Sequence, residues 1–347
     1  MGLDSGDNIK SGHGHRITGY IRALGDRNLK QFSLAEPLSQ ALLDADVSTG
    51  SYLKRRLLYR WATVTAYLAL PKIRSATLNS LSALLGALLA AGSSVPWGTA
   101  AILAASVWLA AAGAGAINSY LDRDIDRVMQ RTSHRPLPLG VIQPAERALY
   151  AGVSLTLTGL LMAALWLNLM ATLFIALGAG VYVFVYTMWL KRKTPWSIVI
   201  GGLAGSCALL AGWFSVTTNF GLLPLFFSIF IFLWTPGHFW GLAIRTKEDS
   251  ELANIPTLAT RYGEKTATKW AAFLNIILIP ISAIPYLLGM LGEVYLIISI
   301  TIGLVILFPN IKLFFTPTRQ RAWTVFKISS PYLAVVYLAV FLDIMLG

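Results

Sequence analysis

The chain has 347 residues, of which 56% are hydrophobic and only 13% are charged, which is about half the charged share of an ordinary soluble protein. So few charges could not cover the surface of a soluble globule, so the composition indicates an integral membrane protein. It also excludes disordered and collagen-like chains. The single cysteine, Cys207, excludes an intramolecular disulfide and a cysteine-based metal cluster. The net charge of +12 does not indicate nucleic acid binding, because the basic residues of a membrane protein first report its orientation in the membrane.

The N-terminal part of the chain differs from the rest. Residues 1–50 are polar and mixed in charge, and we expect a disordered tail without a cleaved signal peptide. Residues 51–74 mix lysines and arginines with aromatic residues, which is typical of an interfacial segment leading into a membrane. Residues 75–347 are then predicted to form a single membrane domain.

Apolar runs fill that domain. A membrane-crossing helix needs about 20 apolar residues, and the mean hydropathy of the chain is +0.63. The fold class predicted is all-α: a polytopic membrane protein with nine transmembrane helices, since no alternating strand pattern of a β-barrel is seen. The expected spans are 75–93, 98–121, 147–166, 169–190, 196–215, 222–243, 270–289, 294–311 and 329–346.

The basic residues are distributed unequally between the two ends of these spans. All 28 lysines and arginines fall before residue 75, in the loops near 122–146, 191–195, 244–269 and 312–328, or at the adjoining helix ends. The opposite loops carry one charge, Glu293. The positive-inside rule therefore predicts a cytoplasmic N-terminus and an outside C-terminus in a plasma (inner) membrane, or the mitochondrial inner membrane in a eukaryote.

The most informative motif closes the second span. Asn118, Asp122 and Asp126 are spaced four residues apart, so a helix would place them on one face. Such polar groups are costly at a membrane boundary unless they are compensated, and oxygen ligands on neighbouring turns suit Mg²⁺ that also binds substrate phosphates. The alternative is a solvated helix end whose acids face neighbouring arginines.

Basic residues follow this motif and also close the fourth span. Arg131 and Arg135 come directly after the acids, and Lys191 and Arg192 lie at the next helix end on the same predicted side. Arginine binds phosphate oxygens with two parallel hydrogen bonds, so these residues are candidates to bind a metal-bridged diphosphate. Lys191 and Arg192 could instead bind a carboxylate of a second substrate, and plain topology signals explain all four equally well.

A second acidic segment follows the sixth span, with Glu248, Asp249 and Glu251 beside basic residues. Two facing acidic sites could hold Mg²⁺ and remove a diphosphate from an allylic carbon, with the metal neutralising the leaving group. Asp249 is the strongest candidate of the three. The alternative is that Glu248 and Glu251 are ordinary solvent-exposed acids of a loop.

His238 is the only histidine in a predicted span and lies two residues after Pro236, where a helix is expected to kink. Its neighbours Trp234, Phe239 and Trp240 would form a flat aromatic wall for a planar acceptor. The alternative is a hydrogen-bonded structural histidine.

Three stretches carry a family resemblance, in the same order and on the same predicted membrane side. They are 118–138 with Asp-Arg-Asp-Ile-Asp and Arg-Thr-x-x-Arg-Pro, 186–202 with Tyr-Thr-x-x-Leu-Lys-Arg, and 232–256 with Phe-Leu-Trp-Thr-Pro-x-His-Phe-Trp and the acidic loop. Over about residues 70–315 the chain resembles the UbiA superfamily of intramembrane prenyltransferases, and within it the heme O synthases (protoheme IX farnesyltransferases).

The resemblance implies an enzyme with a lipid-open cavity that uses Mg²⁺, farnesyl diphosphate and heme B. Farnesyl diphosphate would ionise to an allylic cation, the heme vinyl group would attack it, and water would complete heme O, with no covalent protein nucleophile. Heme A synthase or terminal-oxidase assembly factors would be the downstream partners. The implied metal ligands are Asn118, Asp122, Asp126, Glu248 and Asp249, and the first three of them are also the implied catalytic residues. The residues implied to bind diphosphate are Arg131, Arg135, Lys191 and Arg192. The resemblance also implies that His238 and Trp240 line the heme pocket.

The chain departs from the heme O synthase pattern in the acceptor half. Gly237 stands where a second proline is usual, a proline pair is missing after the Gly-Gly-x-Ala-Gly segment, and 255–265 is similar to quinone- and chlorophyll-type members. A UbiA-type enzyme with an aromatic quinone precursor or a lipid alcohol as acceptor therefore stays open. A transporter is a further alternative, although the acids cluster at one face and do not line a path across the membrane.

Overall fold

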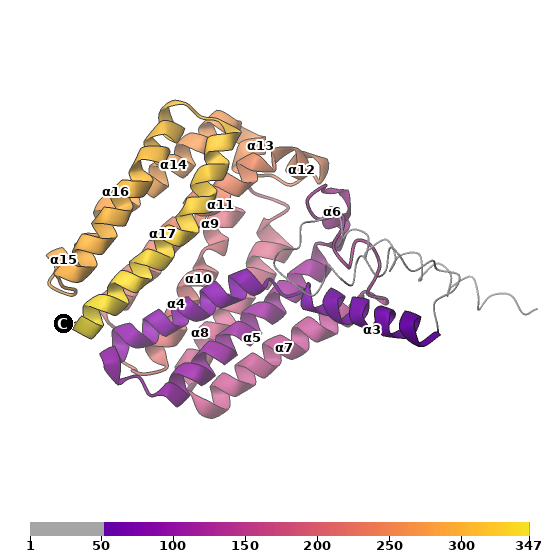
Figure 1. The fold of residues 1–347 in the computed structure, drawn as a ribbon, viewed down its shortest axis with the longest axis horizontal. Coiled ribbons are helices and arrows are strands. Elements are labelled where there is room, and N and C mark those ends of the chain that lie inside the picture. The colour runs from indigo at the N-terminus through magenta and orange to yellow at the C-terminus, as the bar shows by residue number, and fades with distance from the viewer. Residues whose placement is uncertain (1–51, 347) are drawn as a thin grey trace, which may run out of the picture.

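The computed structural model describes residues 52–346, which form an all-helical bundle (Figure 1). The predicted tail 1–50 lies outside the described residues. Nine helical segments of the described chain are long and apolar enough to cross a membrane, which agrees with the predicted fold class. The spans are Ile73–Ser94, Trp97–Leu121, Glu146–Trp166, Leu169–Leu190, Ser197–Phe214, Leu222–Arg245, Glu264–Leu287, Glu293–Phe315 and Arg319–Leu346.

The individual elements subdivide these spans and add short helices between them. In chain order they are α3 (Tyr52–Leu68), α4 (Ile73–Ala91), η1 (Gly92–Ser94), α5 (Trp97–Leu121), α6 (Arg123–Val128), α7 (Glu146–Trp166), α8 (Leu169–Gly180), η2 (Val181–Leu190), α9 (Ser197–Gly201), α10 (Leu203–Phe214), α11 (Leu222–Arg245), α12 (Lys247–Leu252), α13 (Leu258–Tyr262), α14 (Glu264–Ile281), α15 (Ile284–Leu287), α16 (Glu293–Phe315) and α17 (Arg319–Leu346).

The last two spans are longer than the sequence predicts. The expected loop 312–328 is almost entirely helical, with a break only around Pro317. A proline disfavours helical backbone in the residue before it, which explains the position of the break. Apolar runs reveal only the part of a helix that lies in hydrocarbon, so the charged turns at either side of this break are missed.

Small residues let the membrane helices approach closely. A Cβ atom on Gly212 of α10 would lie 1.8 Å from the Ala83 carbonyl oxygen of α4, and one on Gly86 of α4 would lie 2.0 Å from the Leu209 carbonyl oxygen of α10. Any side chain at either glycine would therefore push the two helices apart. Close backbone contact of this kind is how helices associate where lipid removes the hydrophobic drive.

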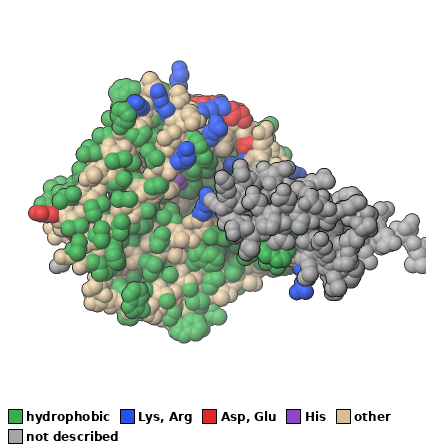
Figure 2. Space-filling model, viewed as in Figure 1, with side chains coloured by type: hydrophobic (Ala, Val, Ile, Leu, Met, Phe, Trp, Pro, Cys, Tyr) green, Lys and Arg blue, Asp and Glu red, His purple; other side chains and the backbone are tan. Residues whose placement is uncertain are grey.

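Charged side chains gather at one end of the bundle, where α6, α12 and α13 lie, and we call this the charged end (Figures 1 and 2). Much of the remaining visible surface is hydrophobic, as lipid contact requires (Figure 2). Helix α3 occupies most of the predicted interfacial segment: Ala62 and Ala66 are buried, while Trp61, Val64 and Leu68 are exposed. This two-faced arrangement fits the interfacial prediction.

Candidate active site

The acidic motif continues the helix of α5 into α6. The backbone N–H of Asp122 donates to the Asn118 carbonyl at 2.9 Å, and that of Asp126 donates to the Asp122 carbonyl at 2.8 Å. Asn118, Asp122 and Asp126 therefore stand on successive turns, and all three are buried. The structure thus places the three polar side chains at the charged end of the bundle and shields them from solvent.

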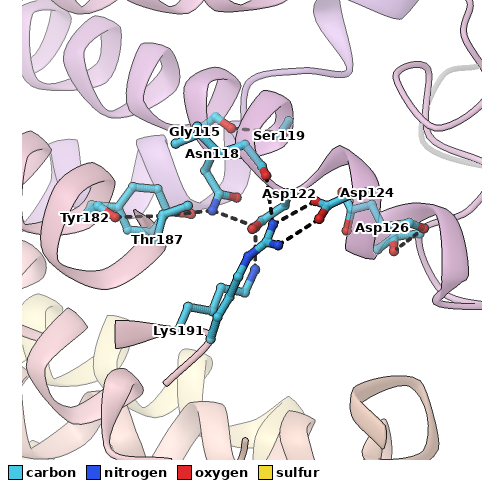
Figure 3. A network of polar contacts seen from close by, with 12 residues as sticks. Gly115, Asn118, Ser119, Asp122, Asp124, Asp126, Tyr182, Thr187 and Lys191 are labelled. Carbon is cyan, nitrogen blue, oxygen red and sulfur yellow. Dashed lines mark hydrogen bonds and ion pairs between the residues drawn. The ribbon is translucent and has the colours of Figure 1, made fainter. Parts of the chain in front are cut away.

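Asp122 is the centre of a polar network that joins two membrane helices (Figure 3). Its Oδ2 accepts hydrogen bonds from the Asn118 amide at 2.8 Å and from the Lys191 ammonium. The Asn118 amide also donates to the Thr187 hydroxyl at 3.0 Å. The second oxygen, Oδ1, is buried and has no hydrogen-bond partner among the described residues, which is unusual for a buried carboxylate oxygen and marks a place for a further ligand.

Lys72, at the start of the first span, belongs to the same network, although the sequence assigns it only to the interfacial segment. Its ammonium donates to Asn118 Oδ1 and, at 2.9 Å, to the Tyr182 hydroxyl. Burial, followed by repulsion from Lys191 and Arg135, lowers the pKa of Lys72 to about 8. The one feature of the sequence that could have indicated this role is the position of Lys72 at the end of an apolar run, on the same predicted membrane side as Asp122.

The helix that carries Lys191 has an unusual geometry. Residues 181–190 form a π-helix, η2, in which hydrogen bonds reach back five residues, and such segments are frequent at functional sites. The Lys191 N–H donates to the Tyr186 carbonyl at 2.8 Å, and the Thr187 hydroxyl donates to the Tyr182 carbonyl at 2.7 Å. The wider turn directs Tyr182, Thr187 and Lys191 together toward the acidic motif (Figure 3).

Asp126 has its own basic partner. Its Oδ2 lies 2.7 Å from Nη1 of Arg135, with 5% of the Asp126 side chain exposed. The Thr132 hydroxyl donates to the Asp126 carbonyl at 3.0 Å and holds the turn that returns Arg135 to the acid. Asp122 and Asp126 thus each stand beside a cation that can also bind phosphate oxygens.

The second acidic segment meets the first. Asp249 of α12 accepts hydrogen bonds from the backbone N–H of Gln130 at 2.8 Å and of Arg131 at 3.2 Å. These two donors lie within five residues of Asp126. Burial, followed by repulsion from Arg135, lowers the pKa of Arg131. Segments almost 120 residues apart in the sequence are therefore joined at the charged end.

The side chain of Glu248 does not contact the acidic motif of α5 and α6. It pairs with Arg319 at the start of α17, and the same guanidinium binds Glu264 of α14 at 2.6 and 2.8 Å. Lys247 lies 3.6 Å from Glu264 and 3.3 Å from Glu251. This network holds α12 against α14 and α17, so Glu248 fixes the position of the loop, and its assignment as a metal ligand stays a prediction.

Arg192 also lies outside the network around Asp122. Its guanidinium binds Asp124 with two hydrogen bonds of 2.7 Å, and this contact lowers the pKa of Asp124 to about 2. The pair borders a cavity of about 650 Å³ that Arg123 and Arg127 also line. Binding of diphosphate by Arg192 stays a prediction, whereas Lys191, its neighbour, does reach Asp122.

The two predicted acceptor residues of α11 lie in different surroundings. His238 is stacked between Trp234 and Phe326, with ring centroids at 4.6 and 4.4 Å, and its Nδ1 contacts the Ser329 hydroxyl. Trp240 is only 2% exposed and packs in a separate hydrophobic cluster with residues of α13 and α14. The structure therefore does not bring His238 and Trp240 onto a common wall.

The residues at the charged end fit an ion such as Mg²⁺ that completes its shell with substrate and water. The donors are hard oxygens, namely the carboxylates of Asp122 and Asp126 and the Asn118 amide, and one carboxylate oxygen is buried without a partner. Within residues 52–346 no group of three or more histidine, cysteine or acidic side chains is gathered to hold a metal by itself. Diphosphate oxygens would therefore have to supply part of the coordination.

Comparison with protein families matches the model described as "UbiA prenyltransferase family" over residues 79–331. The chain belongs to the UbiA prenyltransferase family. This UbiA member is 40% identical over 281 residues to the protoheme IX farnesyltransferase of Metallosphaera sedula, covering 81% of this chain and 96% of the relative. It is 39% identical over 292 residues to that of Acidiphilium cryptum, covering 81% and 91%. The predicted resemblance and the prediction of a prenyltransferase are confirmed.

Solved UbiA structures share the fold. Digeranylgeranylglyceryl phosphate synthase aligns with a TM-score of 0.67 and 21% identity, covering 82% of this chain and 99% of the other. A UbiA homolog from Archaeoglobus fulgidus bound to GPP and Mg²⁺ aligns with a TM-score of 0.59 and 19% identity, covering 79% and 99%. These similarities support the helical architecture of the UbiA member described above.

Proposed function

We propose that this UbiA family member transfers the farnesyl group of farnesyl diphosphate to a vinyl group of heme B in a Mg²⁺-dependent reaction, giving heme O and diphosphate. The names of its relatives support the substrates. The observation that carries the proposal is the contact of Asp249 with the backbone of Gln130 and Arg131, because it joins the second acidic segment to the turn that follows Asp126. The acidic and basic side chains of both segments therefore lie at the same end of the bundle, which supports a shared site there.

The side chains divide into two groups by charge. Asn118, Asp122, Asp126 and Asp249 would bind the metal through oxygen. Lys72, Arg131, Arg135 and Lys191 would bind the diphosphate oxygens, since charge-assisted hydrogen bonds to phosphate are strong and oriented. Bound Mg²⁺ would supply the positive charge that stabilises the diphosphate as it leaves.

The reaction needs no covalent bond to the protein. The bond between the farnesyl C1 and the diphosphate oxygen breaks, and both bonding electrons leave with diphosphate. The vinyl group of heme B uses its π electrons to bond to C1, and the carbon next to the ring becomes cationic. Water adds there and loses a proton, which leaves the hydroxyl group. In this sequence the protein binds diphosphate through its cations and holds the acceptor close to C1.

The membrane position follows the same proposal. The chain is an integral membrane protein, and the charged end would face the cytoplasm, or the matrix in a eukaryote, because nearly all basic residues lie there. The C-terminus of α17 lies at the opposite end of the bundle (Figure 1) and would face outside. Water-soluble magnesium and diphosphate would then be exchanged directly with the inner compartment.

A product assay tests the proposed function. Purified protein is incubated with farnesyl diphosphate, Mg²⁺ and either heme B or a phenolic acid, and products are identified by mass. We expect heme B to gain a farnesyl group and a hydroxyl group, and Asp122→Asn to lower product formation by at least about a hundredfold. A farnesylated phenolic acid without any farnesylated heme would overturn the choice of acceptor and favour the quinone-type alternative.

A further inference from the structure

A column of four nearly parallel aromatic rings joins α11 and α17. The rings of Trp234 and His238 lie 4.6 Å apart at 12°, those of His238 and Phe326 lie 4.4 Å apart at 21°, and those of Phe326 and Trp323 lie 5.1 Å apart at 15°. Aromatic pairs in protein cores also adopt edge-to-face packing, so three successive parallel pairs define a flat, layered surface.

Polar contacts fix the inner part of this column. His238 Nδ1 contacts the Ser329 hydroxyl, and Trp234 Nε1 donates to the Ser329 carbonyl at 3.1 Å. Trp234 is 4% exposed, whereas Trp323 is only partly buried. The column is therefore closed at Trp234 and accessible at Trp323.

The accessible end lies close to the acidic loop. Trp323 follows Arg319 by four residues, about one helical turn, and Arg319 contacts Glu248, the neighbour of Asp249. Helices α4 and α17 meet where the Ser82 and Tyr337 hydroxyls lie 2.9 Å apart, and they diverge from there toward the charged end (Figure 1). A flat molecule on Trp323 would thus lie at the same end of the bundle as the proposed diphosphate site.

Lys327 is an exposed lysine on the same helix. It follows Trp323 by four residues, so the two side chains share one face of α17. It lies eight residues after the start of a membrane-crossing helix, about 12 Å along the axis, and its side chain has no ion pair or hydrogen bond within the part of the chain that the structure describes. Helix α17 has 28 residues and is therefore about 12 Å longer than the hydrocarbon core, which places Lys327 at the inner membrane boundary, where an unpaired ammonium can meet the carboxylate of a ligand.

We propose that Trp323 and Lys327 form the docking site of a planar acceptor that carries carboxylates, the tetrapyrrole of heme B, and this inference rests on the proposed function. The macrocycle extends the ring column at Trp323, and a propionate pairs with the Lys327 ammonium. This docking site gives a common role to a lysine and a tryptophan that share one helix face at the inner end of α17. His238 supports the platform from within and is a positioning residue.

Binding titrations with two probes test the docking site. Heme B and its dimethyl ester, which lacks the carboxylates, are titrated into the full-length protein in lipid nanodiscs without farnesyl diphosphate. We expect wild type to bind heme B about tenfold more tightly than the ester, as one charge-assisted contact would give. Lys327→Gln should bind both probes equally, and Lys327→Arg should restore the preference. Trp323→Leu should weaken both by about threefold to tenfold.

Matched controls and a second readout separate this docking site from general damage. Lys269→Gln and Trp270→Leu change a lysine and a half-exposed tryptophan of α14 and should leave both affinities unchanged. The KM for farnesyl diphosphate should stay at the wild-type value in every variant. If Lys327→Gln retains the full preference for heme B, the docking site is refuted although wild type still makes farnesylated heme. If wild type binds no heme B but farnesylates a phenol, the proposed function fails as well.

Discussion

Lys72 should make the proposed diphosphate site sensitive to alkaline pH. Its ammonium contacts Asn118 and the Tyr182 hydroxyl, and burial is the main cause that lowers its pKa to about 8. The charged form is therefore complete well below pH 8 and is lost as the pH rises through 8. About 90% is charged at pH 7 and about 10% at pH 9. Since kcat/KM reports ionisation in the free enzyme, kcat/KM for farnesyl diphosphate should fall above pH 8.

The size of the effect follows from the contact that the ammonium would make. A hydrogen bond to a charged group contributes about 1.5–3 kcal/mol, which corresponds to about tenfold to a hundredfold in kcat/KM. The kcat/KM of Lys72→Met should be lower than that of wild type by this factor at pH 7, and the two values should differ little above pH 9. Lys72→Arg keeps its charge, so its kcat/KM should stay level across this range.

Initial rates at low farnesyl diphosphate, with saturating heme B and Mg²⁺, measure kcat/KM between about pH 6.5 and 9.5, around the pKa of Lys72. Lys193→Met serves as the control, because Lys193 is an exposed lysine close to the site and its loss should leave the wild-type profile intact. If Lys72→Met retains the fall near pH 8, another group titrates there and Lys72 does not bind the diphosphate.

Three further substitutions examine other parts of the molecule. Asp122→Asn keeps the shape of the side chain but removes its charge, and should lower product formation by at least about a hundredfold while the protein still elutes as wild type. Asp249→Asn should raise the Mg²⁺ concentration needed for half-maximal rate by about tenfold, whereas Glu251→Gln should leave it unchanged. Gly237→Ala places a Cβ 2.6 Å from Asn275 Oδ1 and should lower the free energy of unfolding by about 1–3 kcal/mol, which thermal denaturation measures.

Much of the architecture could be predicted because its causes are local. Nine apolar runs correspond to nine spans of the described chain, and the spacing of Asn118, Asp122 and Asp126 corresponds to successive helical turns. Hydrophobic length and helical periodicity each depend on neighbouring residues alone. Because hydrophobic length reports only the apolar part of a helix, the predicted start of the last span at residue 329 is too late. Trp323 and Lys327 belong to α17, which begins at Arg319.

The site was less predictable because its geometry depends on tertiary contacts. A π-helix over 181–190 has no pattern in the sequence, yet it directs Thr187 and Lys191 toward Asp122. Glu248 and Asp249 are adjacent in sequence but part in space, since Arg319 binds one and the backbone of Gln130 and Arg131 binds the other. Charge pattern alone cannot assign such partners.

The pairing of charges explains how buried acids can serve a site that is proposed to accept a trianionic diphosphate. Only 3% of the Asp122 side chain and 5% of the Asp126 side chain are exposed, and unpaired carboxylates in such places would be strongly destabilising. Lys191 and Arg135 compensate them. A magnesium diphosphate could replace each carboxylate–cation contact by a carboxylate–metal and a cation–phosphate contact, so no charge is left uncompensated. Loss of Lys191 or Arg135 should therefore weaken both substrate binding and folding, because it removes a diphosphate ligand and the partner of a buried acid together.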